Sequence, residues 1–463
     1  MPNTETKTKQ KLERTYTCSV CSTSYTTPRY SKTHYCTPSC RSKARNSKTA
    51  AKRIEKIPYS DNWLWIAREC RRAGTVQILE NVDLEKLFEV YNRRYKCYGW
   101  DADKKVSKFH LCHIAPVSGA NSIGLLHHQN LFIGSSLPNL KHGDKCYKGA
   151  GLSISRLSLQ PRWAVGKDES DKKVFAKIQK YLGSKLIDYA KAHPIKKANR
   201  FVIAERISKL ENNTTALVDL RKMGTQALMQ LEADLNDTIA YSIKLTAKRS
   251  VVVYIEELER FASYQSENSD DYQFVADACR IVAQWLASQK LQSGLCSVAA
   301  TDCYNAFTFT PLRLRDGKDS GKLRDFVGFT AFATLQGAPV DRELITHTLR
   351  SYLEVISLDV KGSGLTAGYS DFTYITEAVE EFKQNAQKVK DALQVVGLLD
   401  GVTTHRMQEA SREHSFFDQW QQDVNSSEFY DYPDDYYQDD GFVSPCIPSH
   451  KRTNYQPPIF VGF

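Results

Sequence analysis

Apolar side chains recur at helical intervals through most of the chain after residue 56. Asp61–Ala73 shows this spacing, with Asp61 placed to cap the first turn and Gly74 placed to end the last one. Residues 83–95 predict a second helix, whose apolar face comprises Leu84, Leu87, Phe88 and Tyr91. Residues 106–114 alternate loosely between polar and apolar, which predicts a strand that leads into a turn rich in proline and glycine.

The region from 165 to 410 is predicted to be mostly helical. Two sets of apolar residues lie at helical spacing, Ile203, Ile207, Leu210 and Leu217 in the first and Leu228, Leu231 and Leu235 in the second. Arg221 and Gly224 interrupt the seam between them, which indicates a helical hairpin or a broken coil and not one long coiled coil. Residues 251–255 predict a strand or a buried helical turn, and residues 275–286 and 374–399 predict helices.

These patterns divide the chain into four regions and indicate an α+β multidomain protein. We expect a small cysteine-rich domain over 1–56, a compact histidine-rich domain over 57–160, a large helical domain over 165–410, and a tail over 411–463. The chain has 463 residues, of which 41% are hydrophobic, so it has enough apolar material for several cores.

Charge is distributed unevenly between the two ends. Residues 1–56 contain 13 Lys and Arg against three acidic residues, whereas residues 413–440 contain nine acidic residues and no Lys or Arg. A basic arm indicates a polyanionic partner, with nucleic acid the foremost candidate, although a solvated surface explains the same charge. The acidic tail cannot bury a core, and we expect it to be disordered. It is either an ordinary solvated tail or a mimic of DNA that covers a basic site.

Missing features exclude several classes of protein. No stretch of about 18 apolar residues predicts a membrane span, and the polar, basic N-terminus does not read as a secretory signal. The sequence contains no P-loop and no G-x-S-x-G elbow. Twelve cysteines, of which four cluster near the N-terminus and the rest are scattered, do not make a disulfide scaffold in a chain of this length. We therefore expect a cytoplasmic protein, in a bacterium or an infected host, with one structural metal site.

Four cysteines form two close pairs, Cys18 with Cys21 and Cys36 with Cys40. Four thiolates at this spacing suit tetrahedral Zn²⁺, which would be structural because protein ligands fill every position. The segment resembles a treble-clef zinc finger, a family in which the last cysteine opens a basic helix. The basic run after it offers contacts to phosphates, and the candidate DNA-binding residues are Arg41, Lys43, Arg45, Lys48, Lys52 and Arg53.

Histidines are concentrated in a loop-rich segment, where they are available for metal or proton chemistry. Five of the eleven lie there: His110, His113, His127, His128 and His142. The segment resembles the motif of HNH (His-Me finger) endonucleases. His113, followed by Ile114 and Pro116, matches its first part. Asn130 and Leu131 match the middle, and Asn139, nine residues after Asn130, matches the helix.

The resemblance implies a ββα-metal (HNH) nuclease unit that cleaves DNA. His113 would be the general base, and Asn130 would hold the loop and orient that histidine. Asn139 would bind a catalytic divalent metal through its amide oxygen, either Mg²⁺ or a transition metal such as Mn²⁺. We expect His127 and His128 to be exposed loop residues, with contact to phosphate or metal as the alternative.

Cys112 departs from the family pattern, which usually has Asp or another hard ligand before the base. A thiolate is a poor ligand for Mg²⁺ and favours softer metals. Three outcomes stay open. His142 supplies the missing ligand, the site takes a transition metal such as Mn²⁺, Ni²⁺ or Zn²⁺, or the unit has lost catalysis and keeps only its fold and binding.

Together these resemblances imply a metal-dependent DNA endonuclease or nickase whose zinc finger helps to hold the substrate. One alternative is a non-enzymatic DNA-binding protein, regulatory or architectural, on a degenerate HNH fold. The other is an adaptor that binds proteins. The helical region would position DNA, form a homodimer or bind a protein partner. A stand-alone chain of this kind is what we expect of a phage or a mobile element.

Overall fold

The protein folds into two compact units, each assembled from separate stretches of the chain. The computed structural model describes residues 13–412, except for 29, 31, 98, 102–105, 144, 241–249, 265–266, 293–306, 363–372, 404 and 410–411. Unit 1 comprises Met1–Arg93, Ala115–Leu131 and Leu152–Lys244, and unit 2 comprises Arg94–Ile114, Phe132–Gly151 and Leu245–Phe463. The structure is mixed α/β and mostly helical, with small sheets. Apart from Arg412, the predicted tail lies outside the described residues.

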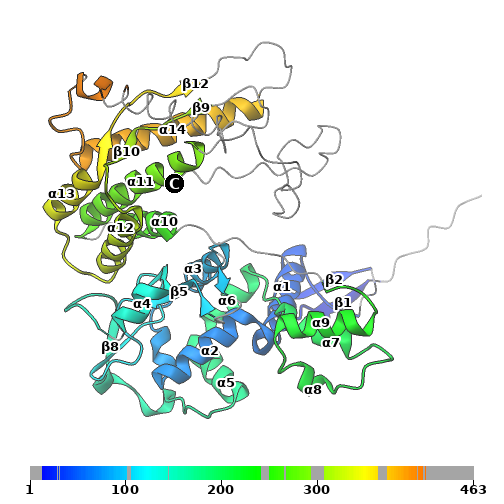
Figure 1. Ribbon diagram of the computed structural model, residues 1–463. Helices are drawn as coiled ribbons and strands as arrows, with labels where there is room; N and C mark the ends of the chain where they lie inside the picture. Colours follow the sequence, from blue (N-terminus) through cyan, green and yellow to red (C-terminus); the bar gives the residue numbers. More distant parts are fainter. Residues whose placement is uncertain are drawn as a thin grey trace, which may run out of the picture. The chain divides into compact units, whose positions relative to one another are not determined.

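Unit 1 combines an N-terminal hairpin with several short helices (Figure 1). Strands β1 Arg14–Thr17 and β2 Ser24–Thr27 pair antiparallel, and β6 Ser122–Gly124 pairs antiparallel with β8 Ser153–Ser155. The unit holds α1 Pro38–Ile54, α2 Asp61–Ala73, most of α3 Leu84–Lys96, α5 Asp171–Leu182, α6 Ser184–Ala192, α7 Asn199–Ile207, α8 Leu217–Leu220 and α9 Thr225–Leu235. Single 3-10 turns lie at Ile57–Tyr59, Val76–Leu79, Arg156–Ser158 and Pro161–Trp163.

The first two helices after the basic run were predicted from local signals, and both predictions are confirmed. Helix α2 begins at Asp61 and ends at Ala73 as predicted, and Gly74 takes the left-handed conformation (φ 79°) that stops it. The predicted capping role of Asp61 is wrong, because the N-cap residue is Ser60 and Asp61 is the first residue of the helix. Asp83 caps α3, because its Oδ1 accepts hydrogen bonds from the backbone N–H groups of Glu85 and Lys86, both at 3.1 Å. The two helices bury their apolar faces in unit 1, with Trp63 of α2 fully buried.

Unit 2 is built around one long helix. Helix α11 Ser269–Gln292 packs against four others, α10 Ser250–Ala262, α12 Ser320–Leu335, α13 Arg342–Tyr352 and α14 Thr373–Val395. Figure 1 shows these helices in green to orange. Its strands are β3 Trp100–Asp101, β4 Val106–Ser107, β5 Phe109–His113, β7 Leu131–Ser135, β9 Phe307–Thr308, β10 Leu312–Leu314, β11 Leu353–Val355 and β12 Lys361–Gly362. The short helix α4 Ser136–His142 follows β7 directly.

The apolar run at 251–255 is helical. All five of its side chains are buried within α10. The run therefore lacks the alternation of apolar and polar residues that distinguishes a helix from a strand in the sequence. The helices predicted at 275–286 and 374–399 are confirmed as α11 and α14, the latter ending at Val395. The predicted broken coil is also confirmed, because α7, α8 and α9 are three short helices around a small apolar core.

The histidine-rich segment is divided between the two units. The strands and helix that carry His113 and Asn139 belong to unit 2, whereas the loop that carries Asn130 belongs to unit 1. The two units are therefore divided at other positions than 57 and 160, the expected limits of the histidine-rich domain. Within the described ranges, no helix has the length and hydropathy needed to cross a bilayer.

Candidate functional site

The four predicted zinc ligands lie together beside the N-terminus of α1. Cys18 follows β1, Cys21 lies in the turn before β2, and Cys36 and Cys40 lie on either side of the helix start. Thr37 caps α1 by accepting from the backbone N–H of Cys40 at 3.2 Å, which puts that cysteine in the first turn. The four sulfur atoms lie within 4.8 Å of one another, the one such group of His, Cys, Asp or Glu in the described part of the chain.

Backbone contacts bring the two cysteine pairs together. The N–H of Cys18 donates to the carbonyl oxygen of Thr23 at 2.9 Å, which closes the turn of the hairpin. The N–H of Ser19 donates to the carbonyl oxygen of His34 at 3.0 Å and so ties the segment before the second pair to this turn. The His34 ring stacks on Tyr16 with centroids 4.0 Å apart, and the metal-binding group consists of the four cysteines alone.

The electrostatics of the cluster favour a bound cation. The hydrogen bond from the backbone N–H of Cys36 lowers the pKa of the Cys18 thiol to about 6. A side-chain hydrogen bond with Cys21, together with burial, raises the pKa of the Cys36 thiol to about 12, because both favour its protonated form. The sulfur of Cys36 lies 3.3 Å from that of Cys21 and 3.6 Å from that of Cys40. Tetrahedral Zn²⁺ with Zn–S bonds of about 2.3 Å needs sulfur atoms about 3.8 Å apart, so the cluster fits structural zinc.

A stripe of positive charge runs along α1 from this cluster. The stripe consists of Arg41, Arg45, Lys48 and Lys52, all exposed. Their spacing of four, three and four residues puts them on one face of the helix. Helix α1 contains no acidic residue, and none of the four cations forms an ion pair with the part of the chain that the structure describes. The stripe therefore presents uncompensated positive charge to solvent.

The other two predicted DNA-binding residues lie elsewhere on α1. Arg53 is half-buried, and its Nη1 donates to the carbonyl oxygens of Ala190 and Lys191 at 2.7 and 2.8 Å, at the end of α6. This guanidinium satisfies the last carbonyls of a helix, which makes its role structural. Lys43 is exposed but lies on a different face from the stripe.

Strand β5 is followed along the chain by β6, β7 and α4. Strand β5 pairs with β7, and α4 follows β7 and packs against β5. His113 is the last residue of β5, and Asn139 lies in α4.

Asn130 is fully buried and bonded at every polar position of its side chain. Its Oδ1 accepts from the backbone N–H of Ala115 at 2.9 Å and of Leu152 at 3.1 Å. Its Nδ2 donates to the carbonyl oxygens of Leu125 at 2.8 Å and Ala115 at 3.2 Å. One amide thus joins the start and the end of the loop between the two strands.

Cys112 lies in the core of unit 2 and departs from the expected metal ligand. It is 1% exposed and belongs to the same apolar cluster as Phe132 and Tyr254. Burial raises the pKa of its thiol far above the usual range, which keeps it protonated. Metal binding requires the thiolate, so this side chain is unsuited to ligate in the observed fold.

Asn139 and His142 are bonded to different parts of unit 2. Asn139 Nδ2 lies 3.0 Å from His110 Nδ1, and burial lowers the pKa of His110, which keeps that ring neutral. His142 Nε2 lies 2.9 Å from the carbonyl oxygen of Lys145. The structure therefore pairs the predicted ligand Asn139 with His110, which the alternation along the strand predicts to be a structural residue.

His127 and His128 are buried, so the prediction that they are exposed is wrong. Their rings lie 4.2 Å apart, and His127 Nδ1 accepts from the backbone N–H of Gln129 at 3.2 Å. Burial lowers the pKa of His127. The loop covers them because it folds back on unit 1, with Leu126 N–H bonded to the carbonyl oxygen of Ile78 at 2.8 Å.

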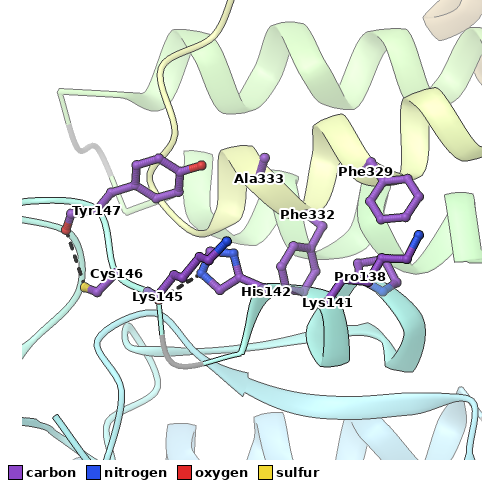
Figure 2. Close-up of a pocket in the computed structure, with 9 residues that line it drawn as sticks. All are labelled: Pro138, Lys141, His142, Lys145, Cys146, Tyr147, Phe329, Phe332 and Ala333. Atoms are coloured by element: carbon purple, nitrogen blue, oxygen red, sulfur yellow. Dashed lines mark hydrogen bonds between the residues drawn. The ribbon is translucent and has the colours of Figure 1, made fainter.

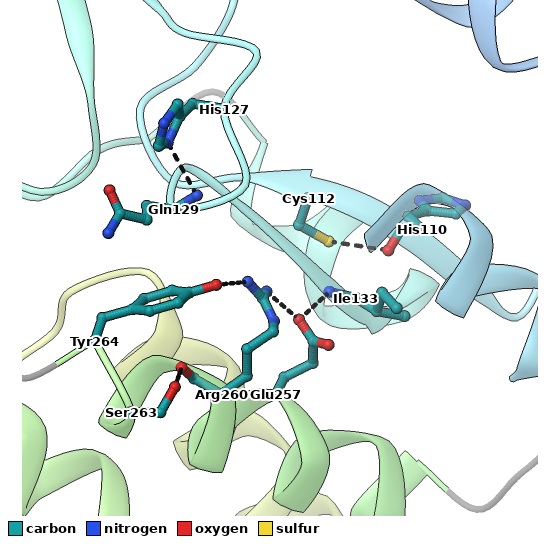
Figure 3. A network of polar contacts seen from close by, with 9 residues as sticks. All are labelled: His110, Cys112, His127, Gln129, Ile133, Glu257, Arg260, Ser263 and Tyr264. Atoms are coloured by element: carbon teal, nitrogen blue, oxygen red, sulfur yellow. Dashed lines mark hydrogen bonds and ion pairs between the residues drawn. The ribbon is translucent and has the colours of Figure 1, made fainter. Parts of the chain in front are cut away.

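Side chains of α10 hold the backbone of β7 (Figure 3). Glu257 Oε2 accepts from the N–H of Ile133 at 3.1 Å, and the hydroxyl of Tyr254 accepts from the N–H of Ser135 at 3.1 Å. Glu257 is fully buried and pairs with Arg260. This support was not predicted from the sequence, because Glu257 is one of three glutamates in the second half of α10 and only the tertiary structure buries it.

Comparison with known proteins finds no relatives. No family model, no curated protein and no solved structure matches the chain.

Proposed function

We propose that this protein binds double-stranded DNA through α1 and the four-cysteine centre that fixes its N-terminus. The cation stripe carries the proposal, because it presents four unpaired positive charges on one face of a helix that has no acid. Arg41 and Lys52 are 11 positions apart, or about 16 Å at about 1.5 Å per residue. Duplex DNA carries one charge per about 1.7 Å, so several phosphates lie within reach.

The zinc finger would act as the scaffold of this surface. Its metal holds the hairpin against the first turn of α1, and the treble-clef resemblance supports the same arrangement. Contacts of this kind go to the DNA backbone, so we expect binding with little dependence on base sequence.

Salt dependence tests the proposal. Four phosphate contacts give a slope of about −3.6 for log K against log salt concentration. We expect the double variant Arg45→Glu/Lys48→Glu to bind a 20-base-pair duplex more weakly, with a slope reduced to about half. Fluorescence anisotropy across a NaCl series measures both.

Lys43→Glu is the matched control, because Lys43 is an exposed cation on another face of the same helix. It should leave the slope close to that of the unaltered protein. An equal loss in Lys43→Glu would contradict a role for the stripe. Absence of salt-sensitive DNA binding in the unaltered protein would overturn the proposal and favour a protein-binding adaptor.

A second candidate function is metal-dependent hydrolysis of a DNA phosphodiester bond. Two observations favour it: the pairing of β5 with β7, which α4 follows, and the four hydrogen bonds by which Asn130 ties the loop. His113 would take the proton of the attacking water. Asn139 would offer its amide oxygen to a divalent metal, which supplies charge neutralisation on the phosphate. Burial of Cys112 removes one expected ligand, which would leave His142 to supply it.

Incubation with supercoiled plasmid separates the two candidate functions. Mg²⁺, Mn²⁺ and Ni²⁺ are each compared with brief EDTA treatment, and zinc content is measured so that loss of the finger is not mistaken for loss of catalysis. Nicked or linear product that requires metal, disappears in His113→Ala and persists in His347→Ala supports hydrolysis. His347 is an exposed control histidine. No cleavage with any metal, together with salt-sensitive binding, identifies a non-enzymatic DNA-binding protein.

A further inference from the structure

Unit 2 contains an open pocket between α4, α12 and the segment that follows α4 (Figure 2). Its volume is about 530 Å³, which lies within the range of about 300–1,000 Å³ that small organic ligands occupy. The lining residues are Pro138, Lys141, His142, Lys145, Cys146, Tyr147, Phe329, Phe332 and Ala333.

Aromatic rings form much of the pocket wall. Phe332 of α12 is buried and meets the His142 ring edge-on, with centroids 5.6 Å apart. Phe329 lies one turn earlier on α12 and is half-buried. Tyr147 is 39% exposed and reaches the pocket from the loop after α4. These flat surfaces are the kind on which nucleobases stack.

Positive charge accompanies the aromatic rings. The Nζ of Lys141 lies 5.0 Å from the centroid of the Phe329 ring, and Lys145 is also exposed at the pocket. No described residue of the lining is acidic, whereas Asp144 lies outside the described residues. Cationic groups beside stacking surfaces match the chemistry of a nucleotide, which joins a planar base to a phosphate.

We propose that this pocket takes one unpaired nucleotide of a DNA strand. Its base lies against Tyr147 and Phe329, and its phosphate contacts Lys141 and Lys145. The inference rests on the proposed DNA binding and adds a second, single-stranded element to it. Lys141, Lys145 and Tyr147 of the lining are exposed to solvent, so the strand on either side of the bound nucleotide would lie outside the pocket.

Protection of Cys146 tests the occupant directly. Cys146 is an exposed thiol of the lining, so a nucleotide in the pocket shields it. The full chain is saturated with a duplex that carries a three-nucleotide 3′ overhang, or with the same duplex made blunt, and then treated with iodoacetamide. Mass spectrometry of the Cys146 peptide gives the alkylation rate. We expect the overhang to slow alkylation about tenfold and the blunt duplex to leave it unchanged.

Matched variants assign the effect to the pocket. Lys141→Glu and Tyr147→Ala should each weaken binding of the overhang duplex about tenfold relative to the blunt one. Lys148→Glu, an exposed neighbour outside the lining, should change both equally. A third arm replaces DNA by millimolar dAMP, and protection by dAMP equal to that by the overhang would identify a free nucleotide and overturn the inference.

The remaining outcomes separate this inference from the function on which it rests. Salt-sensitive binding of both duplexes without protection of Cys146 would overturn the pocket and leave DNA binding standing. Equal protection by blunt and overhang duplexes would also overturn it, because the pocket would then contact paired DNA. Failure to bind either duplex would remove the proposed function itself.

Discussion

Asn130 holds both backbone polar groups of Ala115, its Oδ1 accepting from the N–H at 2.9 Å and its Nδ2 donating to the carbonyl oxygen at 3.2 Å. A side-chain amide reproduces here the paired hydrogen bonds of a β-bridge. The same amide also bonds Leu125 and Leu152, so one side chain fixes both ends of a loop that contains little regular structure. Only a group with two donors and two acceptor lone pairs satisfies all four bonds.

Replacement of Asn130 should destabilise unit 1. Asn130→Ala leaves buried backbone groups of Ala115, Leu125 and Leu152 without partners, and we expect it to lower the free energy of unfolding by about 2–4 kcal/mol. Asn130→Asp keeps the shape but loses both donors, so it should be comparably damaging. Urea unfolding followed by circular dichroism measures the change. Gln129→Ala, at the exposed neighbouring position, is the control, and a loss below about 1 kcal/mol in Asn130→Ala would contradict the account.

The four-cysteine cluster should hold one zinc ion per chain. Cys40→Ser removes the ligand in the first turn of α1, and we expect zinc to be lost on gel filtration in the presence of a mild chelator. Inductively coupled plasma mass spectrometry gives the stoichiometry. Cys146→Ser removes an exposed cysteine outside the cluster and should leave one zinc bound. Full zinc content in both variants would show that Cys40 does not ligate.

Introducing the carboxylate that the HNH pattern has at position 112 should damage the fold. Cys112→Asp places a carboxylate among the apolar side chains of unit 2, where burial disfavours its charged form. We expect the free energy of unfolding to fall by about 3–5 kcal/mol. Cys112→Ala is the control, because it removes the thiol without adding charge. A Cys112→Asp protein of unchanged stability that gains metal-dependent cleavage would show that position 112 faces a metal.

Mild acid should weaken unit 1 through His127. Burial lowers the pKa of this histidine below its usual value near 6.5, so the unfolded chain takes up a proton that the folded chain does not. The contribution of the neutral His127 ring to the free energy of unfolding is therefore fully present above about pH 6.5 and decreases as the pH falls below that value. We expect His127→Gln to narrow the difference in melting temperature between pH 7.5 and pH 5.5. An identical difference in the variant and the unaltered protein would contradict this origin of the pH dependence.

Local signals were sufficient wherever one interaction within a few residues decides the structure. Gly74 ends α2 because it takes a positive φ without steric cost. The cysteine spacing indicated a metal site because a hairpin turn and a helix start bring two close pairs together over a short loop. In both cases the deciding contacts lie near one another along the chain.

Tertiary packing decided the features that the sequence analysis left open or predicted wrongly. His127 and His128 are loop residues by composition, yet the loop folds back on unit 1 and covers them. Arg53 belongs to a basic run, yet it bonds the end of α6, more than 130 residues away. Contacts between residues this far apart in the chain cannot be predicted from the local sequence pattern.

The sequence by itself determined the cysteine cluster, the run of basic residues after it and several of the helices, because each follows from the spacing of residues within a single element. Only the tertiary structure decided that Cys112 lies in a core, that Asn139 faces His110, and that two units share the histidine-rich segment. The physical reason is that burial and pairing depend on neighbours distant in the chain, whose approach is set by packing of the whole unit.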